Sequence, residues 1–205
     1  MRSKFTFKTE LWVSVYTGIK VDSLQDFIEA MSTIPDGSLL YHFYINLLNY
    51  HNLPTLYMNS FSYWLHINGY ESLAERISII DPTEYYSLDD LRTTVIKILK
   101  ECEAEKLKRR LQPFYFLDAR REVLFTGLEA DQLQEFIEGV RNSSIYSLFY
   151  HMVVSKIDRK SPIDEYSEWL MNNGYLKKAE EIAKIDLYAM SLYEAKRKLL
   201  EVLSA

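Results

Sequence analysis

The sequence predicts a predominantly α-helical protein built from two tandem homologous helical-bundle repeats with pseudo-twofold symmetry. Three observations support this prediction: a long internal repeat, helical spacing of apolar residues in both copies, and glycines at matching helix ends. Residues 38–42 (SLLYH) return as residues 147–151 (SLFYH), and residues 62–70 (SYWLHINGY) return as residues 167–175 (SEWLMNNGY). Such self-similarity predicts a duplicated structural unit.

The alignment of the two copies sets the predicted domain boundaries. Phe5 aligns with Phe114 and His42 with His151 without an insertion, and the second copy is then shorter between its histidine and its tryptophan. Loops absorb such deletions most easily. The prediction is a first helical repeat over residues 1–99, a charged helical linker over residues 100–113 and a second helical repeat over residues 114–205.

Each copy opens with a Phe-x-Phe pattern that alternates like a β-strand. The β-favouring runs 12–17 (WVSVYT) and 123–126 (VLFT) follow, and we predict that each pairs back onto its own Phe-x-Phe as a short N-terminal β-hairpin. The alternative is a short helix that ends at Gly18 or Gly127. The predicted hairpin segments are residues 5–17 and residues 114–126.

Five helices are predicted in each copy. The first follows Asp22, where apolar residues recur at i, i+3, i+4 and i+7. The second carries the Tyr-His pair, and the third carries the tryptophan and ends at Gly69 or Gly174, which adopt a left-handed cap at little cost. The fourth is short, and the fifth leads to the end of the copy.

Serine residues mark several of these helix starts. Ser161 is the predicted N-cap of the third helix in the second copy, with Asp164 closing a capping box. Ser87 and Ser191 are the predicted N-caps of the fifth helices. In the first copy this helix is predicted to continue through the charged residues 100–110.

Composition and charge exclude several classes of protein. Hydrophobic residues are 48% and charged residues 26%, which is typical of a globular protein. The net charge of −5 argues against nucleic-acid binding, which needs basic residues to neutralise phosphates. The single cysteine, Cys102, fits a reducing compartment. With no signal peptide and no membrane-length apolar run, a cytoplasmic location is expected.

Six short motifs of the first copy stand in a recognisable order. They are Thr17-Gly18, Tyr41-His42, Phe61-Ser62-Tyr63-Trp64-Leu65, Leu73-Ala74-Glu75, Ile80-Asp81 and Ser87-Leu88-Asp89-Asp90-Leu91-Arg92. This order resembles a family of bacterial and archaeal proteins that is known only as a domain of unknown function. The resemblance covers nearly the whole chain as two tandem copies, with departures at Lys178 and Ala195 in the second. It implies no activity.

A histidine and an aspartate recur in both copies and form the first candidate site. His42 matches His151, and Asp81 matches Asp186. An imidazole beside a carboxylate is typical of a metal pair or a general base. However, a catalytic zinc has three protein ligands and one copy offers two, so no metal is predicted. Asp81 also begins a capping box, which favours a structural role.

Aromatic residues that recur in both copies form the second candidate site. Tyr41 and Tyr150 precede the histidines, and Trp64 and Trp169 lie on a helix face. They would line a pocket for a flat or sugar-like ligand. Packing in the hydrophobic core is the favoured alternative, because large apolar residues are mostly buried.

The second helix sets the expected role of the histidines. A helix over residues 38–48 places His42 beside the apolar stripe formed by Leu39 and Phe43, at the edge of the core. A neutral ring there needs a hydrogen-bond partner, because an unpaired buried ring is costly. We predict a structural or pocket-lining role, with a hydrogen bond from each histidine to the backbone or an acid of its own copy.

No sequence motif points to catalysis. The chain lacks a Gly-rich phosphate loop and a Gly-x-Ser-x-Gly turn, and the basic run 106–110 stands beside Glu101, Glu103 and Glu105, as is usual for a solvated helix end. The prediction is therefore a non-catalytic protein-interaction or adaptor module without a cofactor, binding a protein partner or a second copy of itself. The alternative is a small-molecule-binding protein or enzyme that uses the Tyr-His-Trp region.

Overall fold

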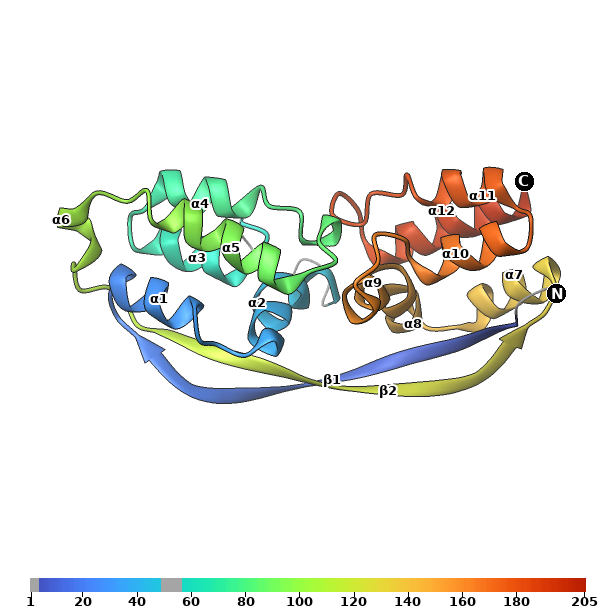
Figure 1. Ribbon diagram of the computed structural model, residues 1–205, viewed down its shortest axis with the longest axis horizontal. Coiled ribbons are helices and arrows are strands. Elements are labelled where there is room, and N and C mark those ends of the chain that lie inside the picture. Colours follow the sequence, from blue (N-terminus) through green and yellow to red (C-terminus); the bar gives the residue numbers. More distant parts are fainter. Residues whose placement is uncertain (1–3, 49–56) are drawn as a thin grey trace. The chain divides into compact units, whose positions relative to one another are not determined.

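The computed structural model describes residues 4–48 and 57–205, and its fold is mixed α/β (Figure 1). Strands β1 (Phe5–Val21) and β2 (Phe114–Ala130) are 17 residues long and pair with each other as an antiparallel two-stranded sheet. The predicted predominantly α-helical fold with hairpins over 5–17 and 114–126 is therefore wrong. Each β-favouring segment forms one continuous strand whose partner is the matching segment of the other copy.

Two matching hydrogen bonds tie the strands together. The Thr17 hydroxyl donates to the Phe116 carbonyl, and the Thr126 hydroxyl donates to the Phe7 carbonyl, each at 2.8 Å. The glycine after each threonine has a φ near +80°, at +84° for Gly18 and +81° for the equivalent residue. The positive φ is accommodated inside a continuing strand, so the alternative of a short helix ending at these glycines is also wrong.

The helices of the first copy follow β1 in the order of the chain. They are α1 (Leu24–Met31), α2 (Asp36–Leu48), α3 (Ser60–Ile67), α4 (Glu71–Ser78), the 3-10 helix η1 (Pro82–Glu84), α5 (Leu88–Leu99) and α6 (Ala104–Leu107). Ser87 caps α5 as predicted, because its hydroxyl accepts from the Asp90 amide. The predicted continuation over residues 100–110 is wrong, since α5 ends at Leu99 and only the short α6 follows.

The helices of the second copy follow β2. They are α7 (Leu133–Asn142), α8 (Ile145–Phe149), the π-helix η2 (Tyr150–Val154), α9 (Ser155–Arg159), α10 (Glu165–Asn172), α11 (Leu176–Ile182) and α12 (Leu192–Ser204). The predicted capping box of Ser191 with Glu194 is confirmed. Ser161 is not the N-cap of α10: Asp164 takes that place and accepts from the Ser167 amide at 2.9 Å. The left-handed Gly69 and Gly174 are confirmed.

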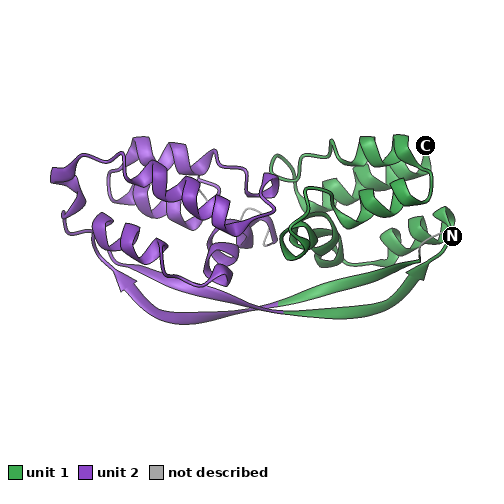
Figure 2. Ribbon diagram, viewed as in Figure 1, with its two compact units in different colours: residues 1–11, 122–205 green, residues 12–121 purple. Residues whose placement is uncertain are grey.

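The chain forms two compact units that divide both strands (Figure 2). Unit 1 contains Met1–Leu11 and Glu122–Ala205, and unit 2 contains Trp12–Arg121. Each unit thus combines the helices of one copy with the first part of the strand from the other copy. The predicted boundaries at residues 99 and 113 follow the sequence repeat, whereas the compact units follow contacts in space.

The exchanged strand parts supply aromatic residues to both cores. In unit 1, Phe7 is fully buried and its ring lies 5.7 Å from that of Phe136, on which Trp169 stacks at 4.4 Å. In unit 2, Phe116 takes the place of Phe7, with its ring 5.2 Å from Phe27, on which Trp64 stacks at 4.7 Å. Each core is therefore incomplete without a phenylalanine pair from the other copy.

The packing of Phe7 against α7 depends on Gly139. A Cβ atom at this helix position would lie 2.2 Å from Phe7 Cε2, so the ring occupies the space of the missing side chain. We expect Gly139→Ala to lower the free energy of unfolding by about 1–3 kcal/mol, although alanine is the better helix former. Urea unfolding would measure the loss, and a Gly139→Ala protein as stable as the parent would contradict this packing.

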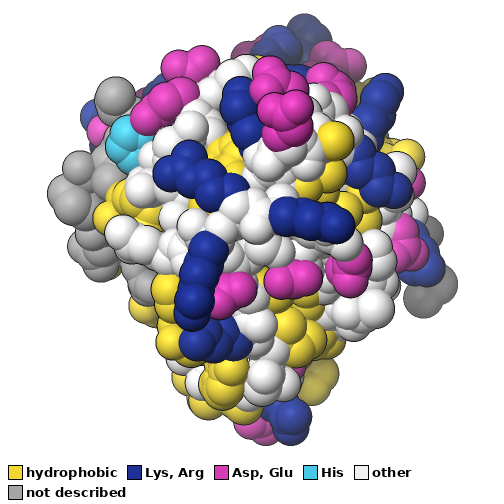
Figure 3. All heavy atoms as spheres, turned by 90° about the vertical axis from the view of Figure 1, so that its left-hand side faces the viewer, with side chains coloured by type: hydrophobic (Ala, Val, Ile, Leu, Met, Phe, Trp, Pro, Cys, Tyr) yellow, Lys and Arg dark blue, Asp and Glu magenta, His cyan; other side chains and the backbone are white. Residues whose placement is uncertain are grey.

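Two surface properties are clear from the described residues. None of the described helices is long and apolar enough to cross a membrane. On the face shown in Figure 3, Lys and Arg side chains alternate with Asp and Glu, and hydrophobic side chains gather in the lower part, toward the strands. This mixture of charges gives no single-sign surface there for a polyanion.

Candidate functional site

The two histidines hold the exchanged strands. His151 Nε2 accepts a hydrogen bond from the backbone amide of Lys8 at 2.8 Å, and His42 Nε2 accepts from the amide of Leu117 at 3.0 Å. Both rings are buried. The predicted bond to the backbone or an acid of the same copy is wrong for His42, because the strand beside it comes from the other copy. The structural role fits this geometry.

The second ring nitrogens differ between the copies. His151 Nδ1 lies 2.5 Å from Glu165 Oε2, which confirms the predicted acid partner in the same copy. Because Nε2 accepts from an amide, the ring proton is assigned to Nδ1, which donates to the carboxylate. His42 Nδ1 is buried and has no hydrogen-bond partner among the described residues.

Burial keeps both rings neutral. It lowers the pKa of His42 to about 3. Burial also lowers the pKa of His151, although the Glu165 hydrogen bond and charge act in the opposite direction. A neutral ring whose Nε2 lone pair is occupied cannot take a proton from a substrate or bind a metal through that atom. Through its Nε2 atom, each histidine thus binds a strand that comes from the other copy.

The recurring aspartates are placed at turns. Asp81 Oδ1 accepts from the amide and hydroxyl of Thr83 at 2.8 and 2.7 Å, so it caps η1 as its capping motif indicates. Asp186 Oδ1 accepts from the amides of Tyr188 and Ala189, both at 2.9 Å. Among the described residues, no group of three or more His, Cys, Asp or Glu is placed to hold a metal ion.

The tryptophans and tyrosines lie mainly in the cores. Trp64 is 3% exposed and Trp169 is 4% exposed, which is the burial expected for core packing. Trp64 Nε1 also donates to the Gln112 carbonyl at 2.7 Å. Tyr150 is buried, and Tyr41 is half-buried. Trp169 also borders a pocket, whose other lining residues were not among the predicted site residues.

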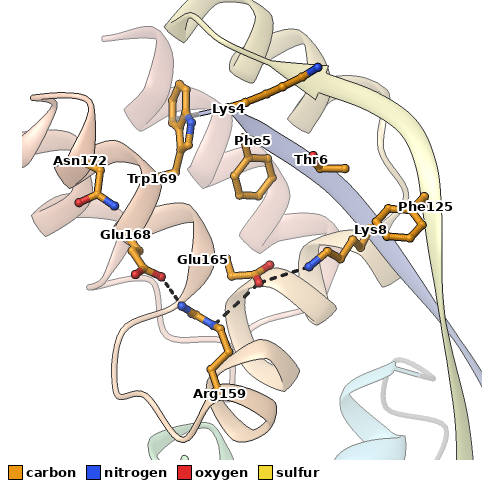
Figure 4. Close-up of a pocket in the computed structure, with 10 residues that line it drawn as sticks. All are labelled: Lys4, Phe5, Thr6, Lys8, Phe125, Arg159, Glu165, Glu168, Trp169 and Asn172. Carbon is orange, nitrogen blue, oxygen red and sulfur yellow. Dashed lines mark hydrogen bonds and ion pairs between the residues drawn. The ribbon is translucent and has the colours of Figure 1, made fainter. Parts of the chain in front are cut away.

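A pocket of about 560 Å³ lies in unit 1 between α10 and the strands (Figure 4). Its wall combines aromatic rings with charged and amide side chains. The lining residues are Lys4, Phe5, Thr6, Lys8, Phe125, Arg159, Glu165, Glu168, Trp169 and Asn172. We call it the unit 1 pocket.

Four charged side chains form a network at one side of the unit 1 pocket. Glu165 Oε1 lies 3.7 Å from Lys8 Nζ and 3.8 Å from Arg159 Nε, and Arg159 also pairs with Glu168. Figure 4 shows Arg159 between the two glutamates, with the Lys8 ammonium directed at Glu165. Two positive and two negative charges therefore balance within the network.

Glu165 links this network to the buried histidine. Burial raises its pKa, but the His151 hydrogen bond and the positive charges of Lys8 and Arg159 outweigh burial and leave the pKa lowered. Glu165 is thus an anion at neutral pH, with one oxygen on His151 and the other facing the two cations. The same carboxylate orients the ring that holds β1 and forms part of the pocket wall.

The equivalent place in unit 2 has different side chains. Leu117 stands where unit 1 has Lys8, as the matching histidine bonds show, and Ser60 stands where unit 1 has Glu165 at the start of the helix. Tyr63 and Ile67 occupy the positions of Glu168 and Asn172. A comparison of residues shared by both copies finds Phe5 and Trp169 but not the charged residues of the pocket, because the charged residues differ between the copies.

Comparisons with known proteins identify a family and a fold. A family model described as a family of unknown function, DUF5752, matches residues 2–204 as a single unit. The predicted reading as two tandem copies of a family domain is therefore corrected: the whole chain is one member. No curated protein matches the chain. The solved structure of OrfY from Thermoproteus tenax is similar, with a TM-score of 0.87 and 24% identity over 99% of this chain and 95% of that one.

Proposed function

Since the chain belongs to the family of unknown function DUF5752, which assigns no activity, we propose a function from the surface: a non-catalytic interaction module whose strands bind a second copy of the chain. The supporting observation is a concentration of exposed apolar side chains on β1 and β2. They are Leu11, Val13, Val15, Tyr16, Tyr115, Val123, Leu124 and Phe125. Apolar clusters of this kind are typical of interaction surfaces.

Each unit carries its own part of this surface. In unit 2 the strand arm consists of residues 12–21 of β1 with residues 114–121 of β2, and in unit 1 it consists of residues 5–11 with residues 122–130. In a two-stranded sheet each strand has one edge without a strand neighbour. Such edges are templates for pairing with another chain. The strand arms therefore offer both backbone groups and apolar side chains to a partner.

A second copy of the chain is the partner that best fits these edges. Every copy of the chain exposes the same apolar edges, so a second copy offers an edge that can pair with the first. Val15 of unit 2 and Leu124 of unit 1 occupy equivalent positions in the repeat and are both exposed, so the surface is matched to itself. Closed, isologous pairing is the common outcome for such surfaces.

Sedimentation velocity across a wide concentration range tests this function. We expect the parent protein to sediment as a dimer and a Val15→Lys, Leu124→Lys double variant to sediment as a monomer, because charge on an edge opposes strand pairing. Ile79→Lys is the matched control, since Ile79 is 78% exposed but lies outside the strands. It should leave the dimer intact.

Two results would contradict the proposal. The first is a parent protein that stays monomeric throughout, which would leave the strand surface to a partner of another sequence. The second is a double variant that remains dimeric with an unchanged circular dichroism spectrum, which would place the dimer interface elsewhere.

A further inference from the structure

The unit 1 pocket contains side chains that the fold does not require. Unit 2 builds the same arrangement of strand, histidine and tryptophan with Leu117 in place of Lys8 and Ser60 in place of Glu165. Comparison of the two units therefore shows which side chains the shared fold needs. Unit 2 folds without the charged network. Ligand binding would explain why unit 1 has one.

Several polar groups of the unit 1 pocket keep unused hydrogen-bonding capacity. The ion pair from Lys8 Nζ to Glu165 spans 3.7 Å, which is longer than a hydrogen bond, and an ammonium has three donors. Within the described part of the chain, neither the Thr6 hydroxyl nor the Asn172 amide has a hydrogen-bond partner. Glu168 adds carboxylate acceptors at the same wall. Donors and acceptors thus face one pocket.

The charge balance of the pocket favours a neutral ligand. Lys8 and Arg159 are matched by Glu165 and Glu168, and Lys4 pairs with Glu129 at 2.5 Å. An anion bound at Lys8 would lie beside Glu165, and a cation bound at Glu168 would lie beside Arg159. Either ion would leave one charge unmatched at close range, where like charges repel most strongly. A neutral molecule with many hydroxyl groups meets no such penalty.

Aromatic surface completes the site. Phe125 is 73% exposed and forms one wall, while Phe5 and Trp169 border the interior (Figure 4). An exposed phenylalanine ring is costly in water and provides a flat apolar face for the C–H side of a sugar ring. A volume of about 560 Å³ lies within the range of small-molecule pockets, which is about 300–1,000 Å³.

We infer that the unit 1 pocket binds a neutral sugar, a mono- or disaccharide, with its ring on Phe125 and its hydroxyl groups on Lys8, Glu168 and Asn172. The inference does not rest on the proposed dimer: of the exposed strand residues, Phe125 is assigned to the sugar and Leu124 to the second copy. Phe125 and Leu124 are adjacent in β2, so their side chains point to opposite faces of the strand. A ligand on Phe125 therefore leaves Leu124 available for the second copy.

Saturation-transfer NMR with the full chain tests this inference. The probes are glucose, galactose, mannose, maltose and cellobiose, with glucose 6-phosphate and gluconate as charged comparators. We expect saturation transfer to at least one neutral sugar, with weaker transfer to the charged comparators. Intrinsic tryptophan fluorescence during titration with that sugar, to which Trp169 at the pocket contributes, would give the dissociation constant.

Two matched variants locate the binding. Phe125→Ala should weaken the affinity by roughly fivefold or more, because it removes the stacking surface. Tyr16→Ala, at the equivalent position of unit 2, should leave the affinity unchanged. Both residues are exposed, so both variants should fold. The absence of saturation transfer to every neutral sugar would overturn the inference. Tighter binding of glucose 6-phosphate than of the neutral sugars would also overturn it, as would sugar binding that Phe125→Ala does not weaken.

Discussion

Phe7→Ala is expected to lower the free energy of unfolding by about 3–5 kcal/mol, the usual cost of removing a buried phenylalanine ring. The ring is fully buried in unit 1, where it packs near Phe136, His151 and Tyr166. It also fills the space above Gly139, so the helix backbone cannot close the cavity without moving. Urea denaturation of the variant and the parent would measure the difference.

Hydrogen exchange would show where the Phe7→Ala loss is felt. Phe7 belongs by sequence to the first copy but packs in the core of unit 1. We expect faster exchange in α7 and α10, with α1 and α3 little changed. Phe125→Ala is a matched control in the same unit, because its exposed ring should contribute less than about 0.5 kcal/mol. Deprotection confined to α1 and α3 would show that each copy folds on its own strand.

The strand exchange is the feature of the fold that sequence reasoning could not obtain. Phe5 and Phe7 have identical counterparts in Phe114 and Phe116, so either pair fits either core. The β-favouring character of these segments is visible in the sequence, but the choice between a local hairpin and the distant strand depends on tertiary contacts. Propensity therefore predicted strand residues here and assigned them the wrong partner.

Helix capping residues, by contrast, could be predicted from the sequence, because their interactions are local. The capping interactions of Asp81, Ser87 and Ser191 are complete within three residues of the chain, so sequence spacing determines them. Ser161 shows the limit of the approach: it sits three residues before Asp164, and both residue types cap helices well. The structure selects Asp164, whose carboxylate also accepts from the Ser167 hydroxyl.

The candidate site was only partly accessible from the sequence. The histidines were found because both copies keep them, but helical spacing placed His42 at the edge of the core, whereas the structure buries both rings. Lys8, Glu165 and Phe125 have no identical counterpart, so a search for shared residues passes over them. In a duplicated protein, residues common to both copies indicate what folding needs. Differences at equivalent positions indicate where one copy has acquired a separate role.

Lowering the pH from 7.5 to 5 is expected to destabilise the protein through its buried histidines. Burial lowers the pKa of His42 to about 3 in the folded state, whereas an unfolded histidine has a pKa of 6.5. Above pH 6.5 the ring is neutral in both states, and the stability is complete. Between pH 6.5 and 3 only the unfolded state binds the proton, so stability falls as the pH falls.

The expected size of this effect is about 2 kcal/mol for His42 at pH 5, from a slope of about 1.4 kcal/mol per pH unit below the unfolded pKa. His151 acts in the same direction, because its pKa is also lowered by burial. The lowered pKa of Glu165 makes a separate contribution that is lost only at lower pH, as the carboxylate becomes protonated. Burial raises the pKa of the Asp164 carboxyl, which acts in the opposite direction as the pH falls, so the contribution of His42 is obtained by comparing a variant with the parent.

His42→Gln separates the titration from the packing. The glutamine carbonyl can accept from the Leu117 amide as His42 Nε2 does, but it carries no titratable proton. We expect the variant to be less stable than the parent at pH 7.5, since the ring contacts with Phe61 and Phe114 are lost. Its stability should nevertheless fall less steeply toward pH 5, with the remaining slope belonging to His151 and the buried carboxyls. Urea midpoints at four pH values would give both slopes, and equal slopes in variant and parent would show that folded His42 takes up a proton as readily as the unfolded histidine does.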